Sequence, residues 1–261
     1  MKSHRAHPLS ARPALALALL FTTLALAPTA SHAQKTPARP DPEIVEEMDE
    51  YATLTVFDPL EPLNRLTFKF NDGLYDYVLR PISKGYTKVV PEPVRGGLSN
   101  FFENIKFPIR FVNSVLQFKF KRAGQETGKF FVNTIGGLGG FIKLSDEVPS
   151  LADIPREDTG QTIGRWGIGA GPYLVLPILG PGSLRDTVGL VGDYYLNPLV
   201  WNDTKDLLNN WETSLAIDTL NVVNETPNLL RTYDAPRQNA IDPYLSVRNA
   251  YLQYREAEVK K

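Results

Sequence analysis

The 261-residue sequence contains no cysteine and only three histidines, His4, His7 and His32. All three histidines lie in an N-terminal segment with the features of a cleavable leader, so the expected mature chain has neither thiol nor imidazole. Ser-His-Asp triads, Cys-His pairs, imidazole bases, and zinc sites made of His or thiolate ligands are therefore excluded. Disulfide bonds are excluded as well. We predict no catalytic, cofactor-binding or metal-binding residue.

The N-terminal segment has the pattern of a signal peptide. Three basic residues precede an apolar run at residues 14–27, which is too short to cross a bilayer as a helix. Pro28 follows the run, and small residues stand at the positions that a signal peptidase reads. We expect cleavage between Ala33 and Gln34, which makes residues 1–33 a signal peptide and predicts export.

Only one short stretch of the expected mature chain has an excess of one sign of charge. Residues 34–57 contain three prolines, two basic and six acidic residues, which predicts a flexible acidic N-terminal arm. Residues 58–261 carry 23 basic and 23 acidic residues, without a basic stripe, so a nucleic-acid partner is not expected. This length without a linker fits one domain, which the following patterns predict to be mainly α-helical.

A first helix is predicted from Asp58-Pro59-Leu60-Glu61, with Asp58 as the capping residue. Apolar residues then recur every three or four positions and share one face; they are Leu63, Leu66, Phe70, Leu74 and Tyr77. We expect Arg80-Pro81 to end the element. Asn71-Asp72-Gly73 is a run of residues typical of turns inside this pattern, which indicates a helix, a bend and a second helix.

Residues 99–135 predict three further helices, separated at residues 106–108 and 121–127. Their phenylalanines do not fit one stripe, which is typical of helices that are deeply buried or face lipid. The residues assigned to this lipid-facing or core belt are Phe101, Phe102, Phe111, Phe118, Phe130 and Phe131.

Thirteen of the nineteen glycines lie between Gly136 and Gly192, where we expect regular helix to give way. The apolar window at residues 163–179 contains one arginine and two prolines, so it cannot be an ordinary transmembrane helix. Its closely spaced glycines favour short extended pieces or close backbone packing. The run from Gly136 to Gly140 lacks the Lys-Ser/Thr of a phosphate-binding loop and is better explained as a helix stop.

Two helices are predicted in the C-terminal third, one at residues 203–224 and one that begins at Asp242-Pro243. Tyr244, Tyr251 and Tyr254 form a stripe on the second helix. On the helix alone, packing on the core explains the stripe better. Together with the phenylalanine-rich helices it favours contact with a bilayer interface.

Carboxylates are the remaining acid–base groups. Five stand in or beside the glycine-rich zone: Asp153, Glu157, Asp158, Asp186 and Asp193. A two-carboxylate hydrolase of envelope polysaccharide needs only one such pair. Ion pairing with neighbouring arginines is the simpler explanation, so the hydrolase is kept as an alternative.

The ordered motifs from Asp58 onward resemble the MlaA/VacJ family. They stand at residues 58–65 (Asp-Pro-Leu-Glu-Pro-Leu-Asn-Arg), 80–81, 91 with 94–102, 113–117, 133–134 with 136–140, 160–167, 171–177, 184–186, and 242–244 with 248 and 251. Nearly the whole chain after residue 57 is covered, which identifies residues 58–261 as an MlaA-like helical domain.

The resemblance implies a helical disc or ring in the inner leaflet of the outer membrane, with an amphipathic channel for mislocalised phospholipid. It implies contact with trimeric porins and delivery of lipid to a periplasmic carrier, without lipid chemistry. Family members are commonly lipoproteins acylated on a cysteine that this sequence lacks, so anchoring would come from its own apolar surface. A structural scaffold around a porin is a further alternative.

Within that picture, the helix break and the glycine-rich segment are the candidates for the channel wall and its gate. The residues so assigned are Asn71, Asp72, Gly73, Gly160, Gly164, Gly167, Gly169, Gly171, Gly180 and Gly182.

Overall fold

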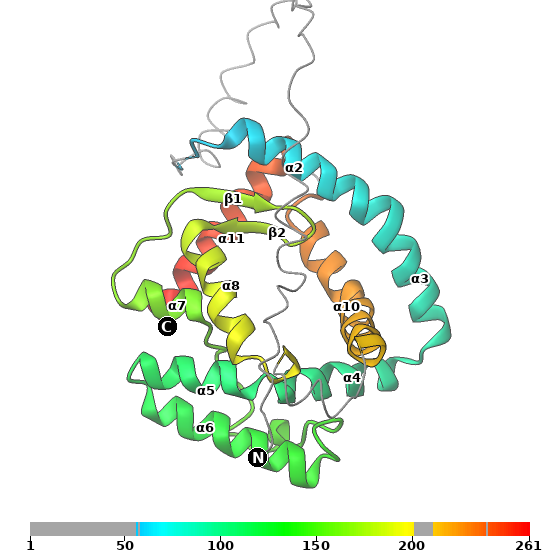
Figure 1. Ribbon diagram of the computed structural model, residues 1–261, viewed down its shortest axis with the longest axis vertical. Helices are drawn as coiled ribbons and strands as arrows, with labels where there is room; N and C mark the ends of the chain where they lie inside the picture. Colours follow the sequence, from blue (N-terminus) through cyan, green and yellow to red (C-terminus); the bar gives the residue numbers. More distant parts are fainter. Residues whose placement is uncertain (1–55, 57, 201–210, 239) are drawn as a thin grey trace, which may run out of the picture. The chain divides into compact units, whose positions relative to one another are not determined.

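The computed structural model describes residue 56 and residues 58–200, 211–238 and 240–261, all within the unit Leu54–Lys261. The expected signal peptide, its cleavage site and nearly all of the acidic arm lie outside the described residues. The described part is mainly α-helical, as predicted, with one short two-stranded sheet (Figure 1).

The first helical stretch is longer than its sequence suggests. Helix α2 (Glu61–Leu74) runs into the π-helical turn η3 (Tyr75–Leu79) and then into α3 (Arg80–Val89). The predicted bend at Asn71-Asp72-Gly73 and the predicted end at Arg80-Pro81 are therefore both wrong. The wider turn lets the Arg80 amide bond to the Tyr75 carbonyl just before Pro81, so the helix continues past a residue without a backbone donor.

The predicted helix cap was also wrong. Leu60 is the N-cap residue of α2 and makes no side-chain cap. Asp58 instead accepts hydrogen bonds from Asn64, Tyr244 and Arg248. This aspartate ties the start of the domain to its C-terminal helix.

Three helices follow: α4 (Glu92–Ile105), α5 (Phe107–Leu116) and α6 (Phe120–Phe131), with α6 continuing as the π-helical turn η4 (Val132–Gly136). The break near Lys106 was predicted, but residues 121–127 lie inside α6. The actual second break is at residues 117–119, where Phe118 has a φ of 58° and the Lys119 amide donates to the Ser114 carbonyl. A left-handed residue closing this bond is a common helix stop.

The glycine-rich segment contains short pieces, as expected. The 3-10 turn η5 (Leu144–Glu147) and helix α7 (Thr159–Arg165) precede an antiparallel hairpin of β1 (Tyr173–Leu176) and β2 (Gly180–Ser183). Tyr173 is opposite Ser183, and Leu176 is opposite Gly180. Helix α8 (Leu184–Leu196) and the 3-10 turn η6 (Pro198–Val200) follow.

Two long helices complete the chain: α10 (Trp211–Asp234) and α11 (Pro243–Lys260). Residues 203–210 of the predicted penultimate helix lie outside the described residues, and the helix continues past the predicted end at Asn224. The predicted start of the last helix is confirmed, because the Asp242 side chain accepts a hydrogen bond from the Leu245 amide at 3.1 Å.

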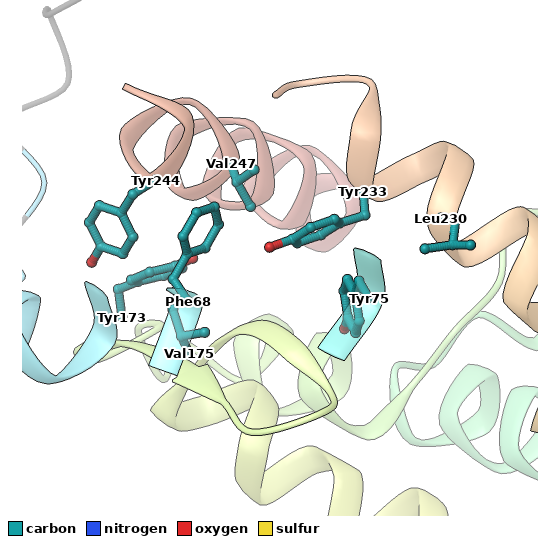
Figure 2. Packing of buried hydrophobic residues seen from close by; sticks show 8 residues of the cluster. All are labelled: Phe68, Tyr75, Tyr173, Val175, Leu230, Tyr233, Tyr244 and Val247. Carbon is teal, nitrogen blue, oxygen red and sulfur yellow. The ribbon is translucent and has the colours of Figure 1, made fainter. Parts of the chain in front are cut away.

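The hydrophobic core lies where the two ends of the domain meet the hairpin. Helix α2 packs on β1 and α11 packs on β2. Figure 2 shows aromatic side chains filling this contact, including an edge-to-face pair of Tyr75 and Tyr233 at 4.6 Å between ring centroids. Tyr244 is buried here, and the Tyr251 hydroxyl donates to Asp186, so these two members of the tyrosine stripe belong to the interior. Tyr254 alone is exposed.

Candidate functional site

The apolar face of α2 exists as predicted, but it points outward. Leu63, Leu66 and Phe70 are 53%, 65% and 55% exposed. The buried face of the same helix carries Asn64 and Asn71, which are 2% and 0% exposed, on either side of the core residue Phe68. A helix in water normally buries its apolar side, so this helix is inverted relative to a soluble protein.

The inversion extends beyond α2. Among the side chains that the structure describes, buried polar and charged groups outnumber buried hydrophobic ones. Large hydrophobic side chains are exposed on α3, α8 and α10 as well, among them Ile82, Val89, Val188, Val191, Leu215 and Val222. Exposed apolar area on this scale marks a surface that contacts something other than water.

Within the described ranges, no helix combines the length and the hydropathy needed to cross a bilayer. The apolar surface is instead shared among several shorter helices.

Two buried asparagines join α2 to the hairpin. The side-chain amide of Asn64 donates to the Tyr173 carbonyl at 2.9 Å and accepts from the Val175 amide at 2.9 Å. Asn71 repeats the arrangement with the Leu176 carbonyl at 2.9 Å and the Ile178 amide at 2.8 Å. Each side chain therefore satisfies two backbone groups that would otherwise be unpaired in the interior.

This asparagine clamp, made by Asn64 and Asn71, depends on matching repeats. Seven residues of an α-helix rise about 10.5 Å. Three residues of a strand span about 10 Å. The two amides therefore meet β1 and the turn that follows it at equivalent backbone positions three residues apart, and the helix and the hairpin are held in a single register.

The clamp holds a strained turn. Ile178 has a φ of 69°, which is rare for a β-branched residue, and Gly180 has a φ of 86°. The Tyr75 hydroxyl donates to the Ile178 carbonyl at 2.7 Å, so both backbone groups of Ile178 are engaged. Conformations of this kind cost about 1–3 kcal/mol and persist only where the surroundings impose them.

The predicted gate triplet divides into two anchors and an open position. Asp72 accepts a hydrogen bond from the Tyr233 hydroxyl at 2.6 Å and an ion pair from Arg237 at 3.1 Å, which ties α2 to α10 and the residues after it. Burial and the Asp72 carboxylate raise the pKa of Tyr233, which keeps its hydroxyl a donor. A methyl group added at Gly73 would meet nothing within 4 Å.

The glycines assigned to the channel wall fall into three groups. Gly160 and Gly164 lie on α7, where α8 and α11 approach closely, and a Cβ at Gly160 would meet Asp186 Oδ1 at 2.6 Å. Gly171, Gly180 and Gly182 belong to the hairpin and its entry. Gly167 and Gly169 have open space at the Cβ position, and Gly167 has a φ of 91°. The structure thus brings Asn71, Gly180 and Gly182 together at the hairpin. Gly160 and Gly164 lie instead on α7, which packs against α8 and α11.

The carboxylates near α7 are held by arginines. Arg255 Nη1 lies 2.7 Å from Asp158 Oδ2, and its Nη2 lies 2.9 Å from Asp186 Oδ1. Burial opposes ionisation of Asp186, but hydrogen bonds from Arg255 and Tyr251 outweigh it and lower its pKa to about 2. A general acid for glycoside cleavage needs a raised pKa, so this pair does not fit a hydrolase.

The remaining carboxylates have mixed surroundings. Glu157 is buried and receives hydrogen bonds from Lys119, Arg122 and Gln117. Burial raises the pKa of Asp193, whose Oδ1 accepts from both the backbone and the hydroxyl of Thr159. Asp153 is exposed.

The phenylalanine belt is not one surface. Phe102 is buried, while Phe118 and Phe131 are exposed. The other three, Phe101, Phe111 and Phe130, are intermediate. Phe101 stacks on Phe141 at 4.8 Å between ring centroids. The belt thus contains both core and surface residues.

Sequence reasoning missed Asn64 and Arg255. Asn64 and Asn71 stand seven positions apart, and polar residues at helical spacing opposite an apolar stripe were the available signal for an inverted helix. Nothing local marks Arg255, since its partners Asp158 and Asp186 are 97 and 69 residues away.

The inverted α2 and its clamped hairpin define the class as a mainly helical protein whose surface suits an apolar environment. Residues 56–258 match the family described as MlaA lipoprotein, and the chain belongs to that family. The resemblance read from the motifs is thereby confirmed.

Relatives of the chain include proteins of several Gram-negative bacteria. It is 37% identical over 198 residues to the intermembrane phospholipid transport system lipoprotein MlaA of Escherichia coli (strain K12), covering 75% of this chain and 76% of that protein. It is 35% identical over 207 residues to an uncharacterized protein of Rickettsia bellii, covering 78% of each.

A solved structure is also similar, with a TM-score of 0.63 and 33% sequence identity over 77% of this chain and 98% of that chain. It comes from work described as the structural basis for maintenance of bacterial outer membrane lipid asymmetry.

Proposed function

We propose that this protein transports phospholipid between membranes, removing mislocalised phospholipid from the outer leaflet of the outer membrane and passing it to a periplasmic carrier. The inversion of α2, with Leu63, Leu66 and Phe70 outside and Asn64 and Asn71 inside, is the observation that carries the proposal. The names of the Escherichia coli relative and the subject of the similar structure support it.

Phospholipid transport requires a path that is polar on one side and apolar on the other. A phospholipid that leaves a leaflet needs polar groups for its headgroup and an apolar environment for its acyl chains. A protein with an apolar exterior and a polar interior supplies both. The strained hairpin held by Asn71 and Tyr75 is the element of this path that we propose as the gate.

The proposed location is the periplasmic side of the outer membrane, beside trimeric porins. Without an acylated cysteine, the exposed side chains of α2, α3 and α8 would anchor the protein in lipid.

The proposed role is not enzymatic. Arg255 neutralises Asp158 and Asp186, and Glu157 is surrounded by two cations. A scaffold that only organises a porin is the second candidate, and the exposed apolar surface would suit it as well.

Lipid extraction and mass spectrometry of the purified protein test the proposal. The exported full-length chain is purified in a mild detergent, beside an outer-membrane protein without a lipid path as the control. Phospholipid retained in stoichiometric amounts above the control is expected. Absence of lipid with turnover of envelope glycan would establish the hydrolase, and absence of both with porin association retained would establish the scaffold.

A further inference from the structure

A polar cavity of about 300 Å³ lies apart from the clamped hairpin. It is formed by side chains of α4, α5, α6, η4 and α10, by Lys143, and by residues 152–154 and 156, and it shares no residue with the hairpin. Most of its lining is amide, amine, guanidinium or carboxylate. A cavity of this kind favours an ionic ligand over an apolar one.

Three of the four cations at the cavity already have an anionic partner. Arg110 Nε lies 2.7 Å from Glu126, Lys143 lies 2.9 Å from Asp146, and Arg156 lies 3.1 Å from Glu103. Lys129 is the exception, since it has no ion-pair or hydrogen-bond partner among the described residues.

Lys129 is partly buried on the last turn of α6. Burial lowers the pKa of its ammonium group, against the opposing field of Glu126. An unpaired, partly desolvated ammonium group gains more from an anion than an exposed one does. A phosphodiester is the anion that the proposed cargo carries.

Two carboxylates complement this amine. Asp153 and Glu225 line the same cavity, and neither has a cationic partner in the part of the chain that the structure describes. Glu225 Oε1 accepts from the Ser99 hydroxyl at 2.6 Å, which leaves its second oxygen available. The cavity thus offers one uncommitted positive group and two uncommitted negative groups.

We propose that this cavity binds a zwitterionic phospholipid headgroup, with the phosphodiester at Lys129 and the ammonium group at Asp153 and Glu225. The inference rests on the proposed transport of phospholipid and names the class of lipid. Exposed apolar side chains adjoin the cavity: Asn100 in its lining donates to the Phe141 carbonyl at 3.3 Å, and Phe141 and Ile142 are exposed. They provide a place for the acyl chains of a lipid whose headgroup is in the cavity.

Three soluble probes separate the parts of this ligand. Dihexanoyl phosphatidylethanolamine has phosphate, ammonium and tails; dihexanoyl phosphatidylglycerol lacks the ammonium; phosphoethanolamine lacks the tails. Affinities are measured by calorimetry on the purified full-length protein in amphipol, with the lipids below their micellar concentration. The wild type should bind phosphatidylethanolamine most tightly.

Two sets of variants assign the contacts. Lys129→Gln should lower the affinity for both lipids about tenfold, and Lys129→Arg should restore most of the binding. The double variant Asp153→Asn with Glu225→Gln should weaken phosphatidylethanolamine while leaving phosphatidylglycerol unchanged or tighter. Lys121→Gln, on the same helix but outside the cavity, and Glu92→Gln are the matched controls and should bind as the wild type does. Thermal unfolding of each variant verifies that it is folded.

Equal binding by the wild type and Lys129→Gln would overturn the proposal, while lipid retained by the purified wild type would leave the transport function standing. Phosphoethanolamine binding as tightly as phosphatidylethanolamine would also overturn it, since the cavity would then be a site for a soluble phosphate ester. A wild type that binds neither lipid and retains none on purification would count against the transport function itself.

Discussion

The side-chain oxygen of Asn71 accepts a hydrogen bond from the backbone amide of Ile178, 107 residues further along the chain, at 2.8 Å. This bond and its partner to the Leu176 carbonyl fix the turn of the hairpin on the inner face of α2. Asn71, which the sequence suggests is part of a turn, is therefore a helical residue that anchors the hairpin.

Replacing Asn71 by Ala should destabilise the protein by roughly 2–4 kcal/mol, because two buried backbone groups lose their partners. Denaturant unfolding of the variant in detergent measures the change. Lys69→Ala, on the exposed side of the same helix, should change stability by less than about 0.5 kcal/mol. An Asn71→Ala protein as stable as the wild type would show that the clamp does not hold the hairpin.

Substitutions at two glycines should act in opposite directions. Gly73 is helical with open space at its Cβ, so Gly73→Ala should stabilise by up to about 1 kcal/mol. A Cβ at Gly189 would meet the Gly160 nitrogen at 2.4 Å, so Gly189→Ala should force α7 and α8 apart and destabilise. Melting temperatures of the two variants give the signs. Destabilisation by Gly73→Ala would mean that this position needs the flexibility of a gate.

The pH dependence of stability should report Asp186. Its pKa is lowered from 3.8 to about 2, so its contribution is present above pH 4 and is lost as the pH falls through 2. The wild type should lose roughly 2 kcal/mol across this window through this group. Asp186→Asn should be less stable at pH 7 and should show a smaller decline between pH 4 and 2. An unchanged decline would mean that Arg255 does not hold this carboxylate ionised.

The helical class and several helix boundaries could be predicted from the sequence because they depend on residues that are close together in the chain. Asp242 caps its helix through a backbone amide three residues away, and Pro108 stands in the first turn of α5, directly after the break at Lys106. The orientation of α2 could not be read in this way. Spacing shows which side chains share a face, but the surrounding medium decides whether Leu66 or Asn64 is buried.

Long-range pairing was equally inaccessible. The π-helical turn at Tyr75–Leu79 lets the helix continue past Pro81. Tyr75 in this turn donates a hydrogen bond to a hairpin about a hundred residues away. Turn propensity at Asn71-Asp72-Gly73 was outweighed by these tertiary bonds. The phenylalanines could not be divided into core and surface residues for the same reason, because Phe102 and Phe131 belong to similar local patterns but differ in burial.

The exposed face of α2 provides the most direct test of the proposed location. Leu66 and Phe70 are exposed, and neither lies in the buried aromatic cluster, so Leu66→Lys with Phe70→Lys should leave the fold intact. If this face lies in lipid, each charge costs up to about 2–3 kcal/mol, less where the side chain reaches the interface. The variant should therefore leave the outer-membrane fraction and appear in the soluble periplasmic fraction.

Lys69→Glu is the matched control, because Lys69 is exposed on the same helix and already charged. It should remain with the membrane at the wild-type level, as measured by immunoblotting of fractions after a high-salt wash. Circular dichroism and thermal unfolding of the double variant separate loss of membrane binding from loss of structure. A folded double variant that stays in the membrane fraction would show that α2 faces water or protein. The inverted helix would then have to be explained by a protein partner covering Leu66 and Phe70, which is the arrangement that the scaffold alternative requires.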